Sequence, residues 1–405
     1  MASMHERATQ SEPASASAAT RLRDRDIVCV GFADWDTELW TNQHHLMSRL
    51  ARENRVLFIE SLGLRQPQLA RRDLTRIARR VRRGIAPPRA RDGLHVLSPL
   101  VLPLHRFAIA RALNRRLLPW LVRRATRRLG MRNPILWAYV PQAEVLIDAL
   151  DPALIVYHCV DDIASQPGID AASFRAAEQR FAARANLVLA SAPTLAKRMR
   201  TLSEHVLDAP NVADTELFAR ALEPGPLDPG VEQLAHPRIV FTGAIVASKL
   251  DIPLIVELAR ARPQWSFALV GPVGLGDPGT DISPLDDEPN IHLLGHRSYA
   301  ELPNVLRAAD AGLIPYAINE LTKSIFPMKV YEYLAAGLPV VTTPLPAIAE
   351  VGEIATAPDA AAIASLLDEV LAHNTPELQL ERSHAAASHS WDARLQEIAT
   401  TIEGL

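Results

Sequence analysis

A loop, a short helix and a buried strand are predicted in succession by Ser324-Ile-Phe-Pro-Met-Lys-Val-Tyr-Glu-Tyr-Leu-Ala-Ala-Gly-Leu-Pro-Val-Val-Thr-Thr343. Pro327 suits the first turn of a helix, where its missing N–H removes no hydrogen bond. Gly337 suits the position just past a helix end, and the apolar residues 339–343 indicate a strand enclosed within a sheet. We therefore expect a helix over 327–336 and a strand over 339–343, as in one unit of a parallel α/β sheet.

Lys329 and Glu332 are three residues apart, so they share one face of this helix near its N-terminal end. A helix N-terminus with a cation beside it is a natural site for an anion, and a carboxylate one turn further on can accept hydrogen bonds from hydroxyl groups. A nucleotide offers both partners. Lys329 and the helix amides would contact its diphosphate, and Glu332 would contact its ribose. The alternative is a Lys–Glu pair on an exposed helix face.

The length and composition of the chain predict a globular protein of two domains. A chain of 405 residues is too long for one core of ordinary size, and 48% hydrophobic with 22% charged residues is typical of soluble proteins. Residues 1–21 are mostly small and polar, so we expect a disordered extension and no signal peptide. No stretch reaches the roughly 18 apolar residues of a membrane span. Cys29 and Cys159 lie in apolar runs, which excludes a disulfide framework and indicates the reducing cytoplasm.

Basic residues are concentrated in one part of the chain. Between Arg65 and Arg132 there are 19 arginines against Asp73 and Asp92, a local charge of +17. Because the net charge of the chain is −3, the remaining residues carry −20. Such a segment favours an anionic partner, which could be a lipid surface, a nucleic acid or a polyanionic substrate.

Strands alternate with helices through both halves of the chain, which predicts an α/β fold of two doubly wound domains. A Pro- and Gly-rich linker at 216–237 separates an N-terminal domain at 22–215 from a C-terminal domain at 238–385. Ligands of such folds bind beyond the carboxyl ends of strands, in this case in a cleft between the two sheets. The predicted strands are 26–32, 55–60, 94–98, 135–138, 154–160 and 187–191 in the first half, and 238–243, 266–270, 291–294, 312–315 and 339–343 in the second.

Three segments carry a family resemblance: Pro210-Asn-Val-Ala-Asp-Thr-Glu-Leu-Phe218, Phe241-Thr-Gly-Ala-Ile-Val-Ala-Ser-Lys249, and Ser324 to Val341. The first is similar to a Pro-Asn-Gly-Val-Asp-x-x-x-Phe hinge, the second to the first turn of a nucleotide-binding domain, and the third to a donor-site helix. Together they resemble the GT-B glycosyltransferases, especially the family-4-like enzymes of bacterial cell-surface polysaccharide assembly. The resemblance implies two Rossmann-like domains facing across a cleft, with 386–405 as a helix that packs back on the N-terminal domain.

The resemblance also implies a hexosyltransferase that takes its sugar from a nucleoside diphosphate and needs no metal and no other cofactor. Lys249 and Lys329 would contact the diphosphate, close to the turn at Gly243, and Glu332 would contact the ribose. Two cations at the diphosphate would stabilise the negative charge of the leaving group. The chain holds only four lysines, and two of them fall at these positions.

Position 324 departs from the family pattern. Many of the resembling enzymes carry a glutamate eight residues before the ribose-binding one, and this chain has Ser324 there. Ser324 is therefore placed in the donor site, with Glu320 as an alternative partner for the hydroxyls of the sugar. Because of this departure, a non-catalytic sugar-nucleotide-binding homologue is the alternative function.

The catalytic candidate is a carboxylate at a strand end. The strand at 154–160 is followed by Asp161 and Asp162, which are placed to accept the proton of an acceptor hydroxyl in the cleft. The resembling enzymes often show Tyr-Asp-x-x-Asp here, and this chain has Tyr157-His-Cys-Val-Asp161. We predict Asp161 as the base or transition-state stabiliser, with His158 and Asp162 as alternatives. Helix capping by the paired aspartates is the structural alternative.

Asp34-Trp-Asp36 has the D-x-D form of a metal-binding motif, but it directly follows the first strand. We therefore expect an acceptor-side loop there and no metal site. Side chains within and after this motif could stack on a sugar or hydrogen-bond to it, and a loop with a core tryptophan is the alternative. These side chains are Trp35, Trp40, Asn42, Gln43, His44 and His45.

Two other functions fit the chain less well. A nicotinamide-dependent oxidoreductase should show Gly-x-Gly-x-x-Gly after the first strand, which residues 31–36 lack. Nucleic acid is not an expected partner, because the arginine-rich segment offers only Phe107 and Trp120 for base stacking. Instead, we expect residues 65–132 to hold a cytoplasmic protein at the inner face of the membrane, where a glycan or lipid-linked acceptor is presented. Arginine-rich codon usage is the alternative explanation.

Overall fold

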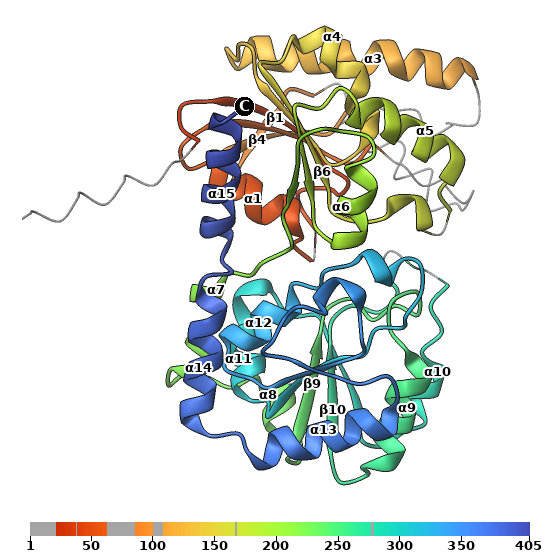
Figure 1. Ribbon diagram of the computed structural model, residues 1–405, viewed down its shortest axis with the longest axis vertical. Coiled ribbons are helices and arrows are strands. Elements are labelled where there is room, and N and C mark those ends of the chain that lie inside the picture. Colours follow the sequence, from red (N-terminus) through yellow and green to blue (C-terminus); the bar gives the residue numbers. More distant parts are fainter. Residues whose placement is uncertain are drawn as a thin grey trace, which may run out of the picture.

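The computed structural model describes residues 22–37, 39–62, 86–99, 108–166, 168–275, 277 and 279–405. Two sheets, of eight and six strands, form two α/β domains that lie one above the other in Figure 1. The predicted α/β class and the doubly wound arrangement are confirmed. The expected N-terminal extension at 1–21 and all eight arginines from Arg65 to Arg83 fall outside the described residues.

The N-terminal domain is a sheet covered by helices on both faces. Its strands, in sheet order, are β3 (Arg89–Arg91), β4 (Leu94–Leu97), β2 (Arg55–Ile59), β1 (Asp26–Val30), β5 (Ile135–Ala138), β6 (Leu154–Cys159), β7 (Leu187–Ala190) and β8 (Val206–Asp208). Its helices are α1 (Asn42–Leu50), α3 (Ala108–Arg128), α4 (Ile147–Leu150), α5 (Ala171–Ala182) and α6 (Pro193–Met199). All neighbouring strands are parallel except the edge pair β3 and β4.

Alternation along β1 shows how both faces of this sheet are buried. Val28 and Val30 pack with α3, α5 and α6, whereas Ile27 and Cys29 pack with α1. Because helices cover each face, the strands are apolar throughout. This continuous apolar pattern is the one from which the strands were predicted.

The C-terminal domain repeats the arrangement with six parallel strands. In sheet order they are β11 (Ile291–Gly295), β10 (Ser266–Val270), β9 (Arg238–Thr242), β12 (Ala311–Ile314), β13 (Val340–Thr342) and β14 (Ala355–Thr356). The helices are α8 (Pro229–Glu232), α9 (Ile252–Ala261), α10 (Ser283–Asp286), α11 (Leu302–Arg307), α12 (Lys329–Ala335) and α13 (Ala360–Ala372). Carboxyl ends of β9, β10 and β12 lead into the segments that carry the candidate site.

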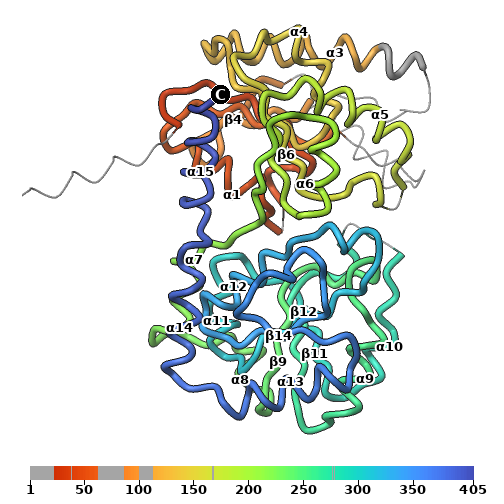
Figure 2. The backbone as a smooth tube through the Cα atoms, in the orientation of Figure 1, coloured from red at the N-terminus to blue at the C-terminus, as the bar shows by residue number. Residues whose placement is uncertain are grey.

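The chain passes between the domains twice. It crosses through α7 (Thr215–Ala219), and it returns through α14 (Pro376–Ala387) and α15 (Trp391–Glu403), which runs beside the N-terminal domain in Figure 2. The ring of Trp391 stacks on His45 of α1, with centroids 5.2 Å apart. Arg49 of α1 pairs with Asp214 at 2.7 Å and with Asp392 at 3.3 Å, so one arginine joins both crossings to the N-terminal domain.

The differences from the expected elements are small and have simple causes. Strands β3, β8 and β14 were not predicted, because two or three residues are too few to show a periodic pattern. The segment at 216–237, expected as an irregular linker, includes the short helix α8, which Asp228 caps through the N–H groups of Gly230 and Val231. None of the described helices combines the length and the apolar composition needed to span a membrane.

Candidate functional site in the interdomain cleft

Residues 324–326 lie against the N-terminal domain. The hydroxyl groups of Thr194, at the start of α6, and Ser324 are 3.1 Å apart. The side-chain N–H of Asn211 donates to the carbonyl oxygen of Phe326 at 2.9 Å, and its side-chain oxygen accepts from Asn42 at 2.8 Å. These bonds fix the segment before α12 at the boundary between the domains.

Lys329 is the first residue of α12, and its side chain lies across the turn that follows β9. A Cβ atom on Gly243 would be 2.6 Å from Cε and 2.7 Å from Nζ of Lys329. Gly243 also has a φ of +131°, which side chains rarely allow. The Nζ atom lies 5.5 Å from the centre of the Phe241 ring. The absence of a side chain at 243 therefore makes room for the ammonium group at the carboxyl end of β9.

Tyr333 holds α12 in this position. A Cβ atom on Gly312 of β12 would be only 2.3 Å from the Tyr333 ring, so the ring packs directly on the strand. Its hydroxyl accepts a hydrogen bond from the N–H of Thr242 at 2.8 Å. Burial raises the pKa of Tyr333, so the hydroxyl stays protonated. Tyr333 thus fixes helix α12 to Thr242, the residue before Gly243.

The helix itself differs from the expectation in its first turn. It begins at Lys329, so the predicted start at 327 is wrong. The N–H groups of residues 330–332 donate to the carbonyl oxygens of Pro327 and Met328 at distances of 3.0–3.2 Å. These three amides are therefore engaged within the first turn, where the Lys329 side chain is a further donor.

Glu332 is buried, with 4% of its surface exposed. The structure describes both Glu332 and Lys329 and shows no ion pair between them. An exposed Lys–Glu pair is therefore ruled out. Burial raises the pKa of Glu332, whereas the Lys329 ammonium and the nearby Tyr299 hydroxyl lower it. Tyr299 also contacts Phe218, the last residue of the hinge-like segment, with ring centroids 5.4 Å apart. Contact with a ribose remains a prediction for this carboxylate.

Ser324 and Glu320 occupy different environments. Ser324 is buried at the domain boundary beside Thr194. The Glu320 side chain is 82% exposed and pairs with Lys323 at 2.7 Å. Of the two, Ser324 is the one that the fold encloses, and a role in binding the donor sugar remains a prediction.

Lys249 lies in the loop between β9 and α9, and its backbone is fixed on both sides. Its N–H donates to Val246 at 3.1 Å, and its carbonyl accepts from the N–H of Ala317 at 2.8 Å. The neighbouring loop after β10 packs equally closely, because a Cβ atom on Gly271 would be 1.9 Å from the carbonyl oxygen of Gly243. The Lys249 side chain is half-buried.

Asp161, which follows β6, interacts electrostatically with Lys249 of the other domain. Burial raises the pKa of Asp161, the Lys249 ammonium lowers it, and the neighbouring Asp162 raises it. A half-buried carboxyl group with a raised pKa is suited to accepting a proton. The structure thus brings Asp161 and Lys249 together, two residues that are 88 positions apart in the sequence.

The two alternatives to Asp161 have structural partners instead. His158 is 1% exposed and stacks on Tyr139, with centroids 4.9 Å apart. Burial and the Arg394 charge lower the pKa of His158 to about 3, which keeps the imidazole neutral. Asp162 pairs with Arg175 at 2.7 Å. These contacts give both side chains structural partners within the N-terminal domain.

The residues after β1 form a core and not a stacking face. Trp35 is 2% exposed and donates from its indole to Asp92 at 2.9 Å, and Asp36 pairs with Arg89 at 2.7 Å. The possible sugar platform at 35–45 is therefore wrong for most of its residues, since Trp35, Asn42, Gln43, His44 and His45 are all buried. In the described part of the chain, no three His, Cys, Asp or Glu side chains converge as metal ligands would.

Sequence reasoning missed Thr194, Tyr299 and Tyr333. Tyr333 follows Glu332 within the 324–343 segment, yet a tyrosine in a buried helix is ordinary and gives no signal. Thr194 and Tyr299 are far from the motif in sequence and reach it only through the fold. Gly312 lies within a predicted strand, where a glycine indicates that another group packs close to the backbone. It was the one sign in the sequence of the contact with the Tyr333 ring.

Comparisons with known proteins agree with this geometry. Residues 236–373 match the family model of the glycosyl transferases group 1. A teichuronic acid biosynthesis glycosyltransferase of Bacillus subtilis, TuaH, is 30% identical over 236 residues, which cover 55% of this chain and 58% of that relative. The chain thus matches little more than half of that relative's length.

Solved structures resemble the whole chain. HepE of Anabaena, crystallised with UDP and glucose, has a TM-score of 0.64 at 16% identity and covers 94% of this chain and 100% of its own. Sucrose-phosphate synthase of Thermosynechococcus elongatus has a TM-score of 0.67 at 14% identity, covering 94% and 98%. At this identity the likeness establishes the fold, which is that of two Rossmann-like domains facing across a cleft. The C-terminal domain is therefore similar to the group 1 glycosyl transferases, and the chain as a whole has the GT-B fold.

Proposed function

We propose that this protein transfers a sugar from a nucleoside diphosphate donor to a hydroxyl group of a cell-surface polysaccharide or lipid-linked acceptor, without a metal ion. The observation that carries the proposal is the position of Lys329, whose ammonium group is held at the Gly243 turn at the carboxyl end of β9. The family match of this domain and the UDP in the HepE structure support a nucleotide as the ligand.

Each charged group of the cleft has a role in such a transfer. The bond between the anomeric carbon and the diphosphate oxygen breaks, and Lys249 and Lys329 stabilise the negative charge that develops on the diphosphate. The acceptor oxygen forms the new bond to the anomeric carbon, and Asp161 takes up the proton of the acceptor hydroxyl. Glu332, one turn after Lys329, accepts hydrogen bonds from the ribose.

The acceptor class and the location rest on other observations. The TuaH relative is named for teichuronic acid biosynthesis, which supports a cell-surface glycan or its lipid-linked precursor as the acceptor. The 19 arginines between Arg65 and Arg132 support a position at the anionic inner face of the cytoplasmic membrane.

Release of nucleoside diphosphate from candidate sugar donors tests the proposal, measured with candidate acceptors and with or without EDTA. We expect release that depends on the acceptor and persists in EDTA. Loss of activity on chelation, restored by divalent ions, would contradict the metal-free mechanism. Donor binding without any acceptor-dependent release would instead identify a non-catalytic sugar-nucleotide-binding protein.

A further inference from the structure

The outward face of α3 has an unusual composition. Its inward face buries Leu118, Leu121, Val122 and Ala125 in the core of the N-terminal domain. Between residues 113 and 128, the outward face holds only arginines and two large apolar side chains. The exposed residues are Leu113, Arg115, Arg116, Trp120, Arg123, Arg124, Arg127 and Arg128. The surface of an ordinary solvated helix mixes charges of both signs, and this one carries six positive charges and no negative charge.

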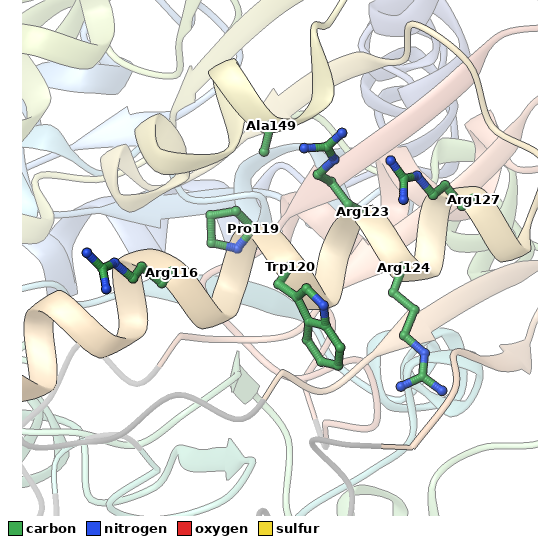
Figure 3. A pocket seen from close by; sticks show the side chains of 7 residues that line it. All are labelled: Arg116, Pro119, Trp120, Arg123, Arg124, Arg127 and Ala149. Carbon is green, nitrogen blue, oxygen red and sulfur yellow. The ribbon is translucent and has the colours of Figure 1, made fainter.

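An open pocket of about 500 Å³ lies along this face. Figure 3 shows Trp120 pointing away from the helix between Arg116 and Arg124, with Arg123 and Arg127 toward the side of Ala149. The Trp120 side chain is 54% exposed, and the Arg124 guanidinium lies 5.7 Å from its ring centre. The lining residues are Arg116, Pro119, Trp120, Arg123, Arg124, Arg127 and Ala149.

The arginines of this pocket have no acidic partners in the described part of the chain. Asp148, next to Ala149 in the pocket wall, pairs instead with Arg184 at 3.0 Å. Elsewhere on the surface, arginines are commonly neutralised, as in the pairs of Arg260 with Glu288 and of Arg262 with Asp368. The positive charge of the α3 face is therefore available to an external anion.

The apolar residues decide which anion fits. Guanidinium groups bind phosphate through two parallel hydrogen bonds, so any polyphosphate would satisfy the arginines. Leu113 and Trp120 are seven residues apart and so lie on the same side of the helix, where a soluble polyanion would leave them in water. A membrane interface accepts both kinds of side chain, with indole rings at the headgroup level and arginines at the phosphates.

We propose that the outward face of α3 binds the phosphate groups of anionic lipids, with Leu113 and Trp120 entering the interface between them. This inference specifies the membrane location proposed above, and it does not depend on the transfer reaction. In Figures 1 and 2, α3 lies at the end of the N-terminal domain remote from the C-terminal domain, so the surface and the cleft are separate. A change in one can be tested without a change in the other.

Tryptophan fluorescence offers a direct test, because Trp120 is the most exposed of the six tryptophans. Trp35, Trp137, Trp265 and Trp391 are buried and Trp40 is half-buried. The full chain is mixed with vesicles of phosphatidylcholine and phosphatidylglycerol whose acyl chains carry bromine. We expect quenching in the wild type and its loss in Trp120→Phe. Equal quenching in both proteins would overturn the proposed insertion of Trp120.

Flotation with the same lipids, without bromine, tests the arginines. Each surface arginine near anionic lipid contributes about fivefold to membrane partitioning, so Arg123→Ala with Arg127→Ala should lower it roughly 25-fold at low salt. The matched control is Arg260→Ala with Arg262→Ala, which removes the same charge from the C-terminal domain and should bind as the wild type does.

Three results would overturn the proposal. These are an equal loss in the control pair, equal binding to vesicles of phosphatidylcholine alone, and binding of soluble polyphosphate without binding to vesicles. The affinity for UDP is measured on the same variants and should not change. Failure of the vesicle experiments with normal UDP binding would leave the transfer reaction standing, whereas failure to bind UDP with normal vesicle binding would contradict only the transferase.

Discussion

Substituting Gly243 with alanine should weaken donor binding by displacing one ammonium group. The added Cβ would lie 2.6 Å from Cε and 2.7 Å from Nζ of Lys329, and the end of a lysine side chain can move away from such a contact. The protein would then remain folded while the ammonium group leaves the turn. A hydrogen bond to a charged group contributes about 1.5–3 kcal/mol, so the affinity for UDP should fall roughly 10- to 150-fold.

The control for this experiment is Gly295→Ala. Gly295 also has a positive φ, +71°, but no atom lies within 4 Å of the position of its Cβ. Both variants should lose about 1–3 kcal/mol of stability from the strained backbone, and only Gly243→Ala should lose affinity. Titration calorimetry with UDP and thermal unfolding measure the two effects separately. A stable Gly243→Ala protein that binds UDP as the wild type does would refute the assignment of Lys329 to the diphosphate.

Three further perturbations follow from the cleft and its surroundings. Asp161→Asn should lower turnover by about 10²–10⁴-fold in a steady-state assay with unchanged donor affinity. Because burial raises the pKa of Asp161, its ionised form destabilises the folded protein. The variant should therefore have a higher melting temperature than the wild type at neutral pH, but not at a pH below the ordinary pKa of an aspartate. Burial lowers the pKa of His158 from 6.5 to about 3, so the wild type should lose up to about 5 kcal/mol as the pH falls through this range; His158→Phe should lack this component in acid-unfolding curves. Asn211→Ala removes the bonds to Phe326 and Asn42 and should lower the free energy of unfolding, measured in urea, by about 1–3 kcal/mol. An Asn→Ala change at an exposed position is the control, and a loss no larger than in this control would refute the contribution of the two bonds.

The fold was largely predictable because the strands of both sheets are parallel, apart from the edge pair β3 and β4, and are buried on two faces. Strands such as β1 and β9 are then continuous apolar runs, and their spacing alone indicates alternating helices. The parts that escaped prediction lack such a signal. Strand β14 has two residues. Helix α12 starts late because the Phe326 carbonyl, which would accept from the Val330 N–H in a helix that began at 327, accepts from Asn211 instead, and the Val330 N–H donates to Pro327.

The site was predictable where one short segment carries its chemistry. Lys329 and Glu332 share a helix face, and the spacing of the sequence shows this directly. The electrostatic interaction between Asp161 and Lys249 needs both domains in place, and no local pattern contains it. The same limit explains the error over residues 35–45: a cluster of aromatic and polar side chains has the composition of a sugar platform, and only the packing shows that it is a core.

The central claim is that Lys249 and Lys329 bind the diphosphate of a nucleotide, and titration calorimetry with UDP in the presence of EDTA tests it most directly. The wild type and the control Lys197→Ala, which removes an exposed lysine of α6, should bind UDP with equal affinity. Lys249→Ala and Lys329→Ala should each weaken binding by about tenfold or more. Equal affinity in all four proteins, or binding that requires a divalent ion, would contradict the account.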